Sequence, residues 1–444
     1  MVLLHTVYLL LHALQLAAGV PGIVETIAGG GLSHKGKIDQ CNDINNSKDG
    51  TGEDARFNYP WGIAHDPLQN VLYVADVGCI DTEHSTDKIR KIDLKTQEVV
   101  TIAGSTQGFA DGFGLYAHFK HIAGIIIDPQ AEVLYVADSG NHRIRVVHLA
   151  NNKVSTIAGL PRAGFVDQGS VSAQFNNPQD MALYRNHKGK RVLYIADSGN
   201  HAIRVMYMED DDVGDVKTLV GGVKGFKDGE KLNAQFYHPV SIVLDADGAY
   251  LYVADNYNHA IRRVETKTGV VTTLTNDGYI HKPDDVNHIL LHFPEGLVYD
   301  SDFNILYACE FNNHDILAVV DGGSVKTLAG RLKGKRDGVG RAARLNHPSR
   351  LTFDKKSRLL YVTDQYNHLI RSVSAFGSTK TYVAKKKSRK KLKASALTPY
   401  NHLYVYAAVV VVVLAIALLA RPCFRCLFKV NNGHTQTAIR QTTL

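Results

Sequence analysis

One motif recurs six times along the chain, and it constrains the fold more than any other feature of the sequence. The second copy reads Leu-Tyr-Val-Ala-Asp at residues 134–138, then Asn-His at 141–142 and Ile-Arg at 144–145. Its acidic residue returns at intervals of 54 to 62 residues, at Asp76, Asp138, Asp197, Asp255, Glu310 and Asp364. Self-similarity at such a period is typical of a repeat architecture, in which each unit buries its apolar surface against its neighbours.

Two further motifs occur once per repeat. Thr-Ile-Ala-Gly or a close relative begins at Thr26, Thr101, Thr156, Thr218, Thr273 and Thr327. An aromatic residue or leucine stands three positions before a proline at Pro60, Pro178, Pro239, Pro294 and Pro348, and Phe119 takes the equivalent place in the copy without proline. Each unit also holds four short runs of β-branched and aromatic residues, which in the second unit are 125–128, 134–137, 144–148 and 154–158. Four strands in each of six units predict a β-propeller.

The Asn-His and Thr-Ile-Ala-Gly signatures resemble the NHL-repeat family over residues 24 to about 374. The repeats together with this resemblance predict an all-β, six-bladed NHL β-propeller, which we place at residues 24–384. One transmembrane α-helix is expected at the C-terminal end on separate grounds, from an apolar run of the sequence. Relatives of this kind include peptide-amidating lyases with a metal in the channel, and RNA-binding proteins.

A propeller also needs its first and last blades to be joined. The last repeat supplies three clear strands, near Leu351, Leu360 and Ile370. The segment 24–29 has no blade of its own and is the favoured fourth strand, although residues 379–384 are an alternative. Either pairing removes the open sheet edge that an unclosed ring would expose.

The acidic and Asn-His positions suggest at first a ring of metal ligands. A residue repeated in every blade nevertheless points the same way in each copy, one blade-width from the next, so the six copies cannot converge on one ion. Asp and Asn at turns bond neighbouring backbone groups. We therefore expect a structural role, with the His and Arg of the motif bridging turns or adjacent blades.

A ligand site is expected where the blades differ, at the start of the inner strands. Two registers there bring charged, amide and aromatic side chains to the channel mouth, and the proposed ligand-binding residues are Trp61, Gln179, Asp180, Glu295 and Arg350. A charged trio beside an aromatic residue suits a small molecule or a peptide. A solvated channel with an ordinary ion pair is the alternative.

Both ends of the chain are apolar. Residues 1–19 carry no charged side chain and end in small residues, which is typical of a signal peptide, with a buried helix or an uncleaved anchor as alternatives. Residues 403–420 are uncharged and long enough for a transmembrane helix, although a buried strand is another interpretation. Between the propeller and this segment, 385–402 is a basic stalk, and 421–444 is then a short cytoplasmic tail. A solvated spacer, a protease site and a polyanion-binding segment are the possible roles of the stalk.

The predicted orientation is type I, in the plasma membrane or an endomembrane, with the propeller extracellular or lumenal. The distribution of positive charge opposes this orientation, because seven basic residues lie in 385–393, before the apolar segment 403–420, and only three lie shortly after it. The first apolar segment of a chain, here 1–19, nevertheless usually sets the topology. Asn45 begins a glycosylation sequon, and Cys423 and Cys426 suit cytoplasmic palmitoylation. Cys41 and Cys79 lie in two enlarged loops of the first blade, and we predict a disulfide between them, with free thiols as the alternative.

The charge of the folded part of the chain argues against a nucleic-acid-binding function. The formal net charge is +7, yet residues 22–384 carry −4, because eleven of the 50 basic residues lie beyond residue 384. A nucleic-acid partner would need a basic surface on the fold itself. The sequence therefore predicts a membrane protein that contacts lipid and displays a module binding an extracellular protein, peptide or glycan. We expect no catalytic residue, metal or cofactor. A propeller enzyme of the peptide-amidating-lyase type, with a metal in its channel, is the alternative.

Overall fold

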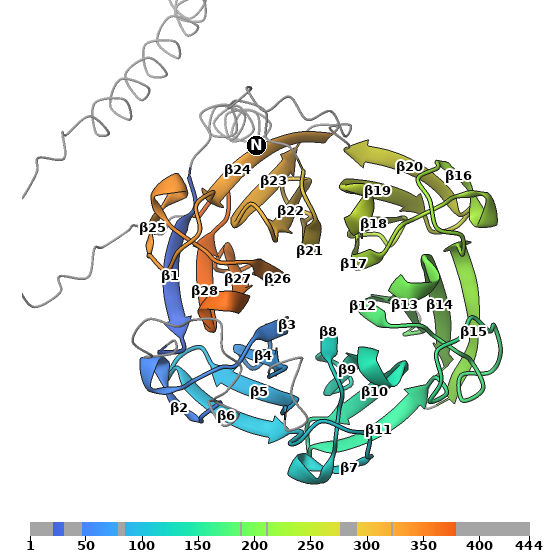
Figure 1. The fold of residues 1–444 in the computed structure, drawn as a ribbon, viewed down its shortest axis with the longest axis horizontal. Coiled ribbons are helices and arrows are strands. Elements are labelled where there is room, and N and C mark those ends of the chain that lie inside the picture. Colours follow the sequence, from blue (N-terminus) through green and yellow to red (C-terminus); the bar gives the residue numbers. More distant parts are fainter. Residues whose placement is uncertain are drawn as a thin grey trace, which may run out of the picture. The chain divides into compact units, whose positions relative to one another are not determined.

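Six antiparallel sheets stand around a central axis in the described part of the chain (Figure 1). The computed structural model describes residues 21–30, 47–78, 85–186, 189–209, 212–275, 291–320 and 323–378. Each sheet is one blade, and within a blade neighbouring strands are antiparallel. The chain therefore forms the six-bladed β-propeller that its repeat predicts.

The first three blades follow the chain from the innermost strand outward. Blade 1 consists of β3 (Pro60–Asp66), β4 (Val71–Asp76), β5 (Lys88–Asp93), β6 (Glu98–Ala103) and the short outer β2 (Gly50–Thr51). Blade 2 consists of β8 (Ile122–Asp128), β9 (Val133–Asp138), β10 (Arg143–His148), β11 (Lys153–Ala158) and β7 (Gly112–Phe113). Blade 3 consists of β12 (Pro178–Arg185), β13 (Arg191–Asp197), β14 (Ala202–Glu209) and β15 (Asp212–Gly221).

The remaining blades have the same plan. Blade 4 consists of β17 (Pro239–Leu244), β18 (Tyr250–Asp255), β19 (Ala260–Glu265), β20 (Val270–Thr275) and β16 (Gly229–Glu230). Blade 5 consists of β21 (Pro294–Asp300), β22 (Ile305–Glu310), β23 (Asp315–Val320) and β24 (Ser324–Gly330). Blade 6 consists of β26 (Pro348–Asp354), β27 (Leu359–Asp364), β28 (Leu369–Ser374), β1 (Ile23–Ala28) and β25 (Gly338–Val339).

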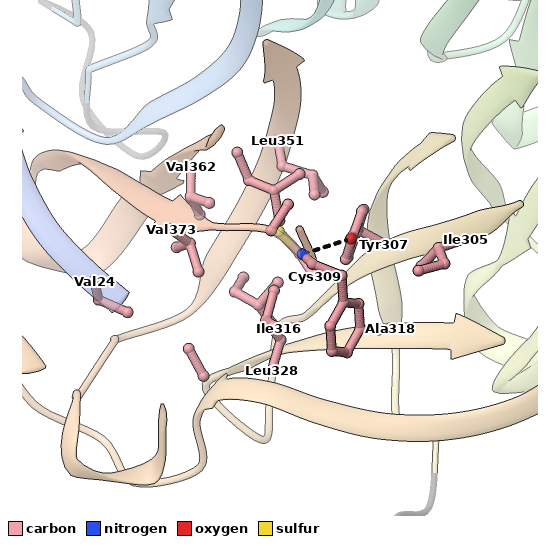
Figure 2. Packing of buried hydrophobic residues seen from close by; sticks show 14 of the residues in the cluster. Val24, Ile305, Tyr307, Cys309, Ile316, Ala318, Leu328, Leu351, Val362 and Val373 are labelled. Atoms are coloured by element: carbon pink, nitrogen blue, oxygen red, sulfur yellow. Dashed lines mark hydrogen bonds between the residues drawn. The ribbon is translucent and has the colours of Figure 1, made fainter. Parts of the chain in front are cut away.

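Strand β1 closes the ring, which confirms the expectation that the N-terminal segment completes the last blade. Thr26 pairs with Arg371 of β28 in an antiparallel ladder. Val24 is fully buried in the apolar cluster between blades 5 and 6, which also contains Tyr307 and Cys309 (Figure 2). The two ends of the propeller are thus held by backbone hydrogen bonds and by a shared core. The alternative segment, 379–384, lies outside the described residues.

The sheets bury apolar side chains on both faces, because each blade packs against the next. Six clusters of buried residues alternate with the blades around the ring. In the cluster of Figure 2, the backbone N–H of Phe376 donates to the hydroxyl of Tyr307 at 3.1 Å, so the one polar group of that ring is satisfied. Burial of this apolar surface is the main stabilising contribution.

One face of the ring holds the entries to the inner strands, and we call it the mouth face. The first residue of each inner strand pairs with the acidic residue that ends the second strand, as in Pro178 with Asp197 and Pro239 with Asp255. The turn that follows the second strand therefore lies beside the entry to the inner strand. In four blades a short 3-10 turn forms there: η3 (Ser139–Asn141), η4 (Ser198–Asn200), η6 (Asn256–Asn258) and η9 (Gln365–Asn367).

Four blades have a fifth strand of two residues, where four strands were predicted. These strands, β2, β7, β16 and β25, form where the connector between blades runs along the outer edge of a sheet. The predicted segments 1–19, 385–402, 403–420 and 421–444 all lie outside the described residues. Within the described part of the chain, no helix has the length and apolar character needed to cross a bilayer.

Candidate functional site

A buried arginine organises the turn of each regular blade, and blade 3 shows how. One Nη of Arg204 donates to Asp197 at 2.7 Å, and the other donates to Asp167 at 2.6 Å. The guanidinium also donates to the carbonyls of Gln174 and Val166. Asp167 in turn accepts from the N–H and hydroxyl of Thr218. Asp197, Arg204 and Thr218 thus hold one turn together with Asp167 of the connector. The role of the repeated Asp and Arg is structural, as the sequence predicted.

The same arrangement recurs in four other blades. Each arginine there has a fully buried side chain and two carboxylate partners, and the sets are Arg90 with Asp76 and Asp49, Arg145 with Asp138 and Asp111, Arg262 with Asp255 and Asp228, and Arg371 with Asp364 and Asp337. Burial raises the pKa of Asp197 and of Asp255 to about 6, although the arginine beside each carboxylate acts in the opposite direction.

The Asn-His pair ties each blade to the next. Asn200 donates to Asp197 at 2.8 Å and to the carbonyl of Gly164 at 2.7 Å. His201 adopts a left-handed conformation with φ of 54°, and its Nδ1 accepts the backbone N–H of His238 in blade 4 at 3.3 Å. Histidine tolerates this conformation better than most residues do.

We call this contact the histidine clamp. It joins the motif histidine to the residue that precedes the inner strand of the next blade, and it recurs as His142 with Asn177, His259 with Phe293, His314 with His347, and His368 with Tyr59. In blade 1 the equivalent position, directly before β5, is taken by Asp87. There Asp87 accepts the N–H of His121 at 2.9 Å instead, so a carboxylate replaces the missing ring.

Three glycines and three polar side chains close the channel at the mouth. Gly62, Gly124 and Gly296 are the third residues of the inner strands of blades 1, 2 and 5, and a Cβ atom there would lie 2.4 to 2.8 Å from atoms of the neighbouring inner strand. Blades 3, 4 and 6 have Asp180, Ser241 and Arg350 at this register, and all six residues except Gly296 line a cavity of about 310 Å³ in the channel. The glycines leave the room that the larger side chains fill.

Arg350 joins four blades at this point. Its guanidinium donates to the carboxylate of Glu295 at 3.0 Å and to the carbonyl of Val240 at 2.8 Å, and it reaches the carbonyl of Gln179 at 3.5 Å. Asp180 accepts from the hydroxyl of Ser241 at 2.7 Å. Three of the predicted ligand-binding residues, Asp180, Glu295 and Arg350, are therefore brought together, in a network that we call the mouth plug.

The charges of the mouth plug compensate one another. Burial raises the pKa of Asp180 and of Glu295, while the Arg350 guanidinium beside them acts against that rise. Arg350 is only 4% exposed, whereas Asp180 and Glu295 keep partial exposure. A guanidinium between two carboxylates takes the place that a bound cation would otherwise occupy.

The other two predicted residues lie at the edge of this network. Gln179 is partly exposed and contributes its backbone carbonyl to Arg350. Trp61 is also partly exposed, but it packs against the apolar cluster between blades 1 and 2. The ligand-binding role of the five residues stays a prediction, and the structure shows that Arg350 pairs with Glu295 whereas Asp180 accepts from Ser241.

Sequence reasoning missed an arc of aromatic and histidine rings on the mouth face. It extends from blade 3 to blade 1 as two chains of ring contacts with centroids 4.4 to 5.9 Å apart. One chain runs from blade 3 through blade 4 to the entry of blade 5, and the other runs from blade 5 through blade 6 to the entry of blade 1. We call it the mouth-face arc, and it comprises His201, Tyr237, His238, Tyr257, His259, His292, Phe293, Phe311, His314, His347, Tyr366, His368 and Tyr59. The signal was in the sequence, because the residue before the inner-strand proline is aromatic or histidine in blades 1, 4, 5 and 6.

The modification and disulfide predictions fall on Cys41, Asn45, Cys79, Cys423 and Cys426, which all lie outside the described residues. The bases of the two enlarged loops are described and adjoin, because the ammonium of Lys88 donates to the hydroxyl of Ser47 at 2.9 Å. Among the described residues, no group of three or more His, Cys, Asp or Glu side chains is placed to hold a metal ion.

Comparison with curated proteins points to NHL-repeat proteins. The human protein named NHL repeat-containing protein 2 is 30% identical over 300 residues, which are 61% of this chain and 40% of that protein. The chloroplastic protein SUPPRESSOR OF QUENCHING 1 of Arabidopsis thaliana is 30% identical over 281 residues, or 60% of this chain and 25% of that one. The chain thus spans less than half the length of these relatives. No family model matches it.

Solved structures support the fold alone. A protein described as an auxiliary nutrient binding protein, from Bacteroides ovatus, superposes with a TM-score of 0.55 at 19% identity, over 80% of this chain and 77% of that one. A protein of the same description from Bacteroides thetaiotaomicron also gives a TM-score of 0.55, at 17% identity. At this identity, fold does not transfer function.

Proposed function

Because the chain is an NHL-type β-propeller, we propose that it is a single-pass membrane protein that displays the propeller, outside the cell or in a lumen, as a module that binds a protein, peptide or glycan. The observation that supports binding is the mouth-face arc. The apolar segments 1–19 and 403–420 support the membrane location and the type I orientation. The helix then contacts membrane lipid.

The arc has the composition of a recognition surface. Its rings combine an apolar body with a polar tip, which is why such residues are enriched where proteins meet their partners. Tyr257 is 47% exposed, and Tyr237, Phe293 and Tyr366 are partly exposed, so a ligand can reach them. The arc is also asymmetric, because Asn177 stands at the entry to blade 3 where blade 4 has His238. A binding face needs such a departure from the repeat.

The mouth plug supplies the floor beneath this surface. Trp61, Gln179, Asp180 and Glu295 keep partial exposure at the channel mouth. Arg350 donates there to the backbone carbonyls of Gln179, Val240 and Glu295. A network that spans four blades keeps the floor rigid, and a rigid site loses less conformational entropy of its own when a ligand binds.

The enzyme alternative, a lyase with a metal in the channel, is not favoured by this geometry. Its metal would need three or more ligating side chains within reach of one ion, and no such group of His, Cys, Asp or Glu occurs among the described residues. Here the guanidinium of Arg350 already bonds Glu295 and lies close enough to Asp180 to affect its pKa. Metal analysis of the purified chain tests the alternative directly, since a stoichiometric bound metal would revive the enzyme.

Alanine substitution in the arc tests the binding function. The full chain, its Tyr237→Ala/Tyr257→Ala variant and a Tyr116→Ala control are compared on arrays of peptides and glycans. Tyr116 is 82% exposed on blade 2 and lies away from the arc. Loss of bound signal at least tenfold greater in the arc variant than in the control is expected. Equal signals would mean that the arc is not the contact surface.

Membrane orientation is tested separately. Translation with microsomes, followed by glycosidase treatment and protease digestion, is expected to give a chain glycosylated at Asn45 with a protected propeller. An unmodified, digestible propeller would place it on the cytosolic side and contradict the proposed display.

A further inference from the structure

In the described part of the chain, two seams between blades carry the same cluster of one lysine and two histidines. In each cluster the first histidine comes from the Asn-His motif, and the second precedes the next inner strand. The clusters are Lys224 with His201 and His238, and Lys333 with His314 and His347. The ring centroids of the two histidines are 5.2 Å apart in the first cluster and 4.6 Å apart in the second. We call them the paired clusters.

The paired clusters are built alike in detail. Each lysine precedes a glycine of the connector, and it forms an isolated parallel bridge to the apolar residue of the third motif, Lys224 to Phe236 and Lys333 to Leu345. Both lysines are exposed. The ammonium of Lys224 also lies 4.1 Å from the ring centroid of Tyr237. The backbone therefore places two cations in equivalent positions two blades apart on one face.

Both clusters offer donors and positive charge. The Nδ1 atoms of His201 and His314 accept backbone N–H groups, so the proton of each neutral ring lies on Nε2, which then donates. The charged group near these rings is the lysine of each cluster, which together with burial lowers the pKa of its motif histidine. Ammonium and imidazole donors together suit an anion.

The surface between and beside the clusters narrows the choice of anion. Aromatic rings of the arc, among them Tyr257 and Phe293, lie between the two clusters, and their faces suit the C–H groups of sugar rings. Beyond the second cluster, the exposed basic residues Lys335, Arg336 and Arg341 extend the positive charge along blade 6.

From this geometry we infer that the mouth face binds a sulfated glycan, with one sulfate group at each of the paired clusters and sugar rings on the aromatic residues between them. The inference rests on the proposed function and names its ligand class. A stiff chain with repeated permanent negative charges matches two fixed anion sites better than a flexible acidic peptide does. A nucleic acid would need a wider basic footprint than a body of net charge −4 provides.

A heparin-derived octasaccharide and its desulfated form are the probes. All proteins are full chains in which the seven basic residues of 385–393 are replaced by glutamine, because that stretch would itself bind polyanions. The Lys224→Gln/Lys333→Gln variant is compared with Lys153→Gln/Lys217→Gln, which removes two exposed lysines from the outer strands β11 and β15. Binding is measured by calorimetry at two salt concentrations.

The octasaccharide is expected to bind about tenfold more weakly to the paired-cluster variant than to the lysine control, with a smaller salt dependence. The desulfated form is expected to bind weakly to both. Equal binding by the two variants, or tighter binding of polyglutamate or single-stranded RNA than of the octasaccharide, would overturn the inference. If Tyr237→Ala/Tyr257→Ala still abolishes binding on the arrays, the proposed function stands without it.

Discussion

The seam between blades 2 and 3 and the seam between blades 3 and 4 share their backbone bonds but differ in the side chains they present. His142 accepts the N–H of Asn177 at 3.2 Å, and His201 accepts the N–H of His238 at 3.3 Å. Where the first seam has Ala163, the second has Lys224 at the equivalent position. Both seams thus keep the bond between the motif histidine and the next blade's backbone. The side chains that do not take part in this bond differ between the seams, and these are the ones that can recognise a ligand.

The arginines of the propeller also divide into a repeated structural set and one residue that occurs once. Arg204 and its counterparts lie in the outer parts of five blades, each with carboxylates of its own blade and connector. Arg350 occurs once, at the centre, and its partners come from three other blades. Blade 5 has Leu317 in place of the repeated arginine, so an apolar residue can replace it.

The largest effect is expected from breaking the repeated network. Arg204→Met leaves Asp197 without its cation in a fully buried site, which costs about 3–5 kcal/mol of unfolding free energy. Chemical denaturation of the full chain measures this cost. Leu317→Met, at the same position of blade 5, is the matched control and is expected to cost less than about 1.5 kcal/mol. Equal costs would show that the ion pair adds nothing.

Acid is expected to weaken the histidine clamp that all these seams share. Burial lowers the pKa of His368 to about 4, from an ordinary value of 6.5. The neutral ring therefore contributes fully above pH 6.5, and its contribution is lost as pH falls towards 4, on the order of 3 kcal/mol. Relative to His368→Gln, which cannot titrate, the wild type is expected to lose that advantage between pH 7 and pH 4. A constant difference in denaturation midpoints would contradict the lowered pKa.

A smaller effect is expected at the mouth plug. Arg350→Met leaves Glu295 and several carbonyls without a donor, but these groups border the partly exposed channel and can reach water. The expected cost is about 1–3 kcal/mol, below that of Arg204→Met in the same denaturation assay. A cost equal to or above that of Arg204→Met would mean that the central arginine is as much a part of the framework as the repeated ones.

The smallest effect is expected when one of the paired clusters is introduced into a seam that lacks it, which tests the comparison of the two seams. Ala163→Lys/Asn177→His gives the seam between blades 2 and 3 the side chains of its neighbour. Asn177 has φ of 50° and His238 has φ of 53°, so histidine fits the backbone there. A third cluster is expected to tighten octasaccharide binding about threefold, whereas Ala163→Gln/Asn177→His is expected to leave it unchanged. Equal affinities would count against the clusters as anion sites.

Much of the fold was predictable because its signals are local. Alternating apolar runs gave the strands, and turn residues gave their boundaries. The closing role of β1 was also predictable, since an unpaired strand and an incomplete blade stood at opposite ends of the repeat. The bonding of Arg350 to Glu295 and to the carbonyls of Val240 and Gln179 was not predictable, because no pattern in a sequence says which groups meet across a channel. The mouth-face arc was missed. A single aromatic or histidine residue before a proline does not indicate a surface, and only the closed ring brings several of them together from neighbouring blades.

The sequence by itself determined the number of blades, the order of their strands and the structural role of the repeated Asp, Asn, His and Arg. All of these depend on contacts within one repeat or between consecutive ones. Only the tertiary structure decided which residues make a site. Arg350 reaches the carbonyl of Gln179, 171 positions earlier in the chain, because ring closure brings the inner strands of all six blades to one axis. A contact of that kind follows from the geometry of the closed ring, not from any pattern along the chain.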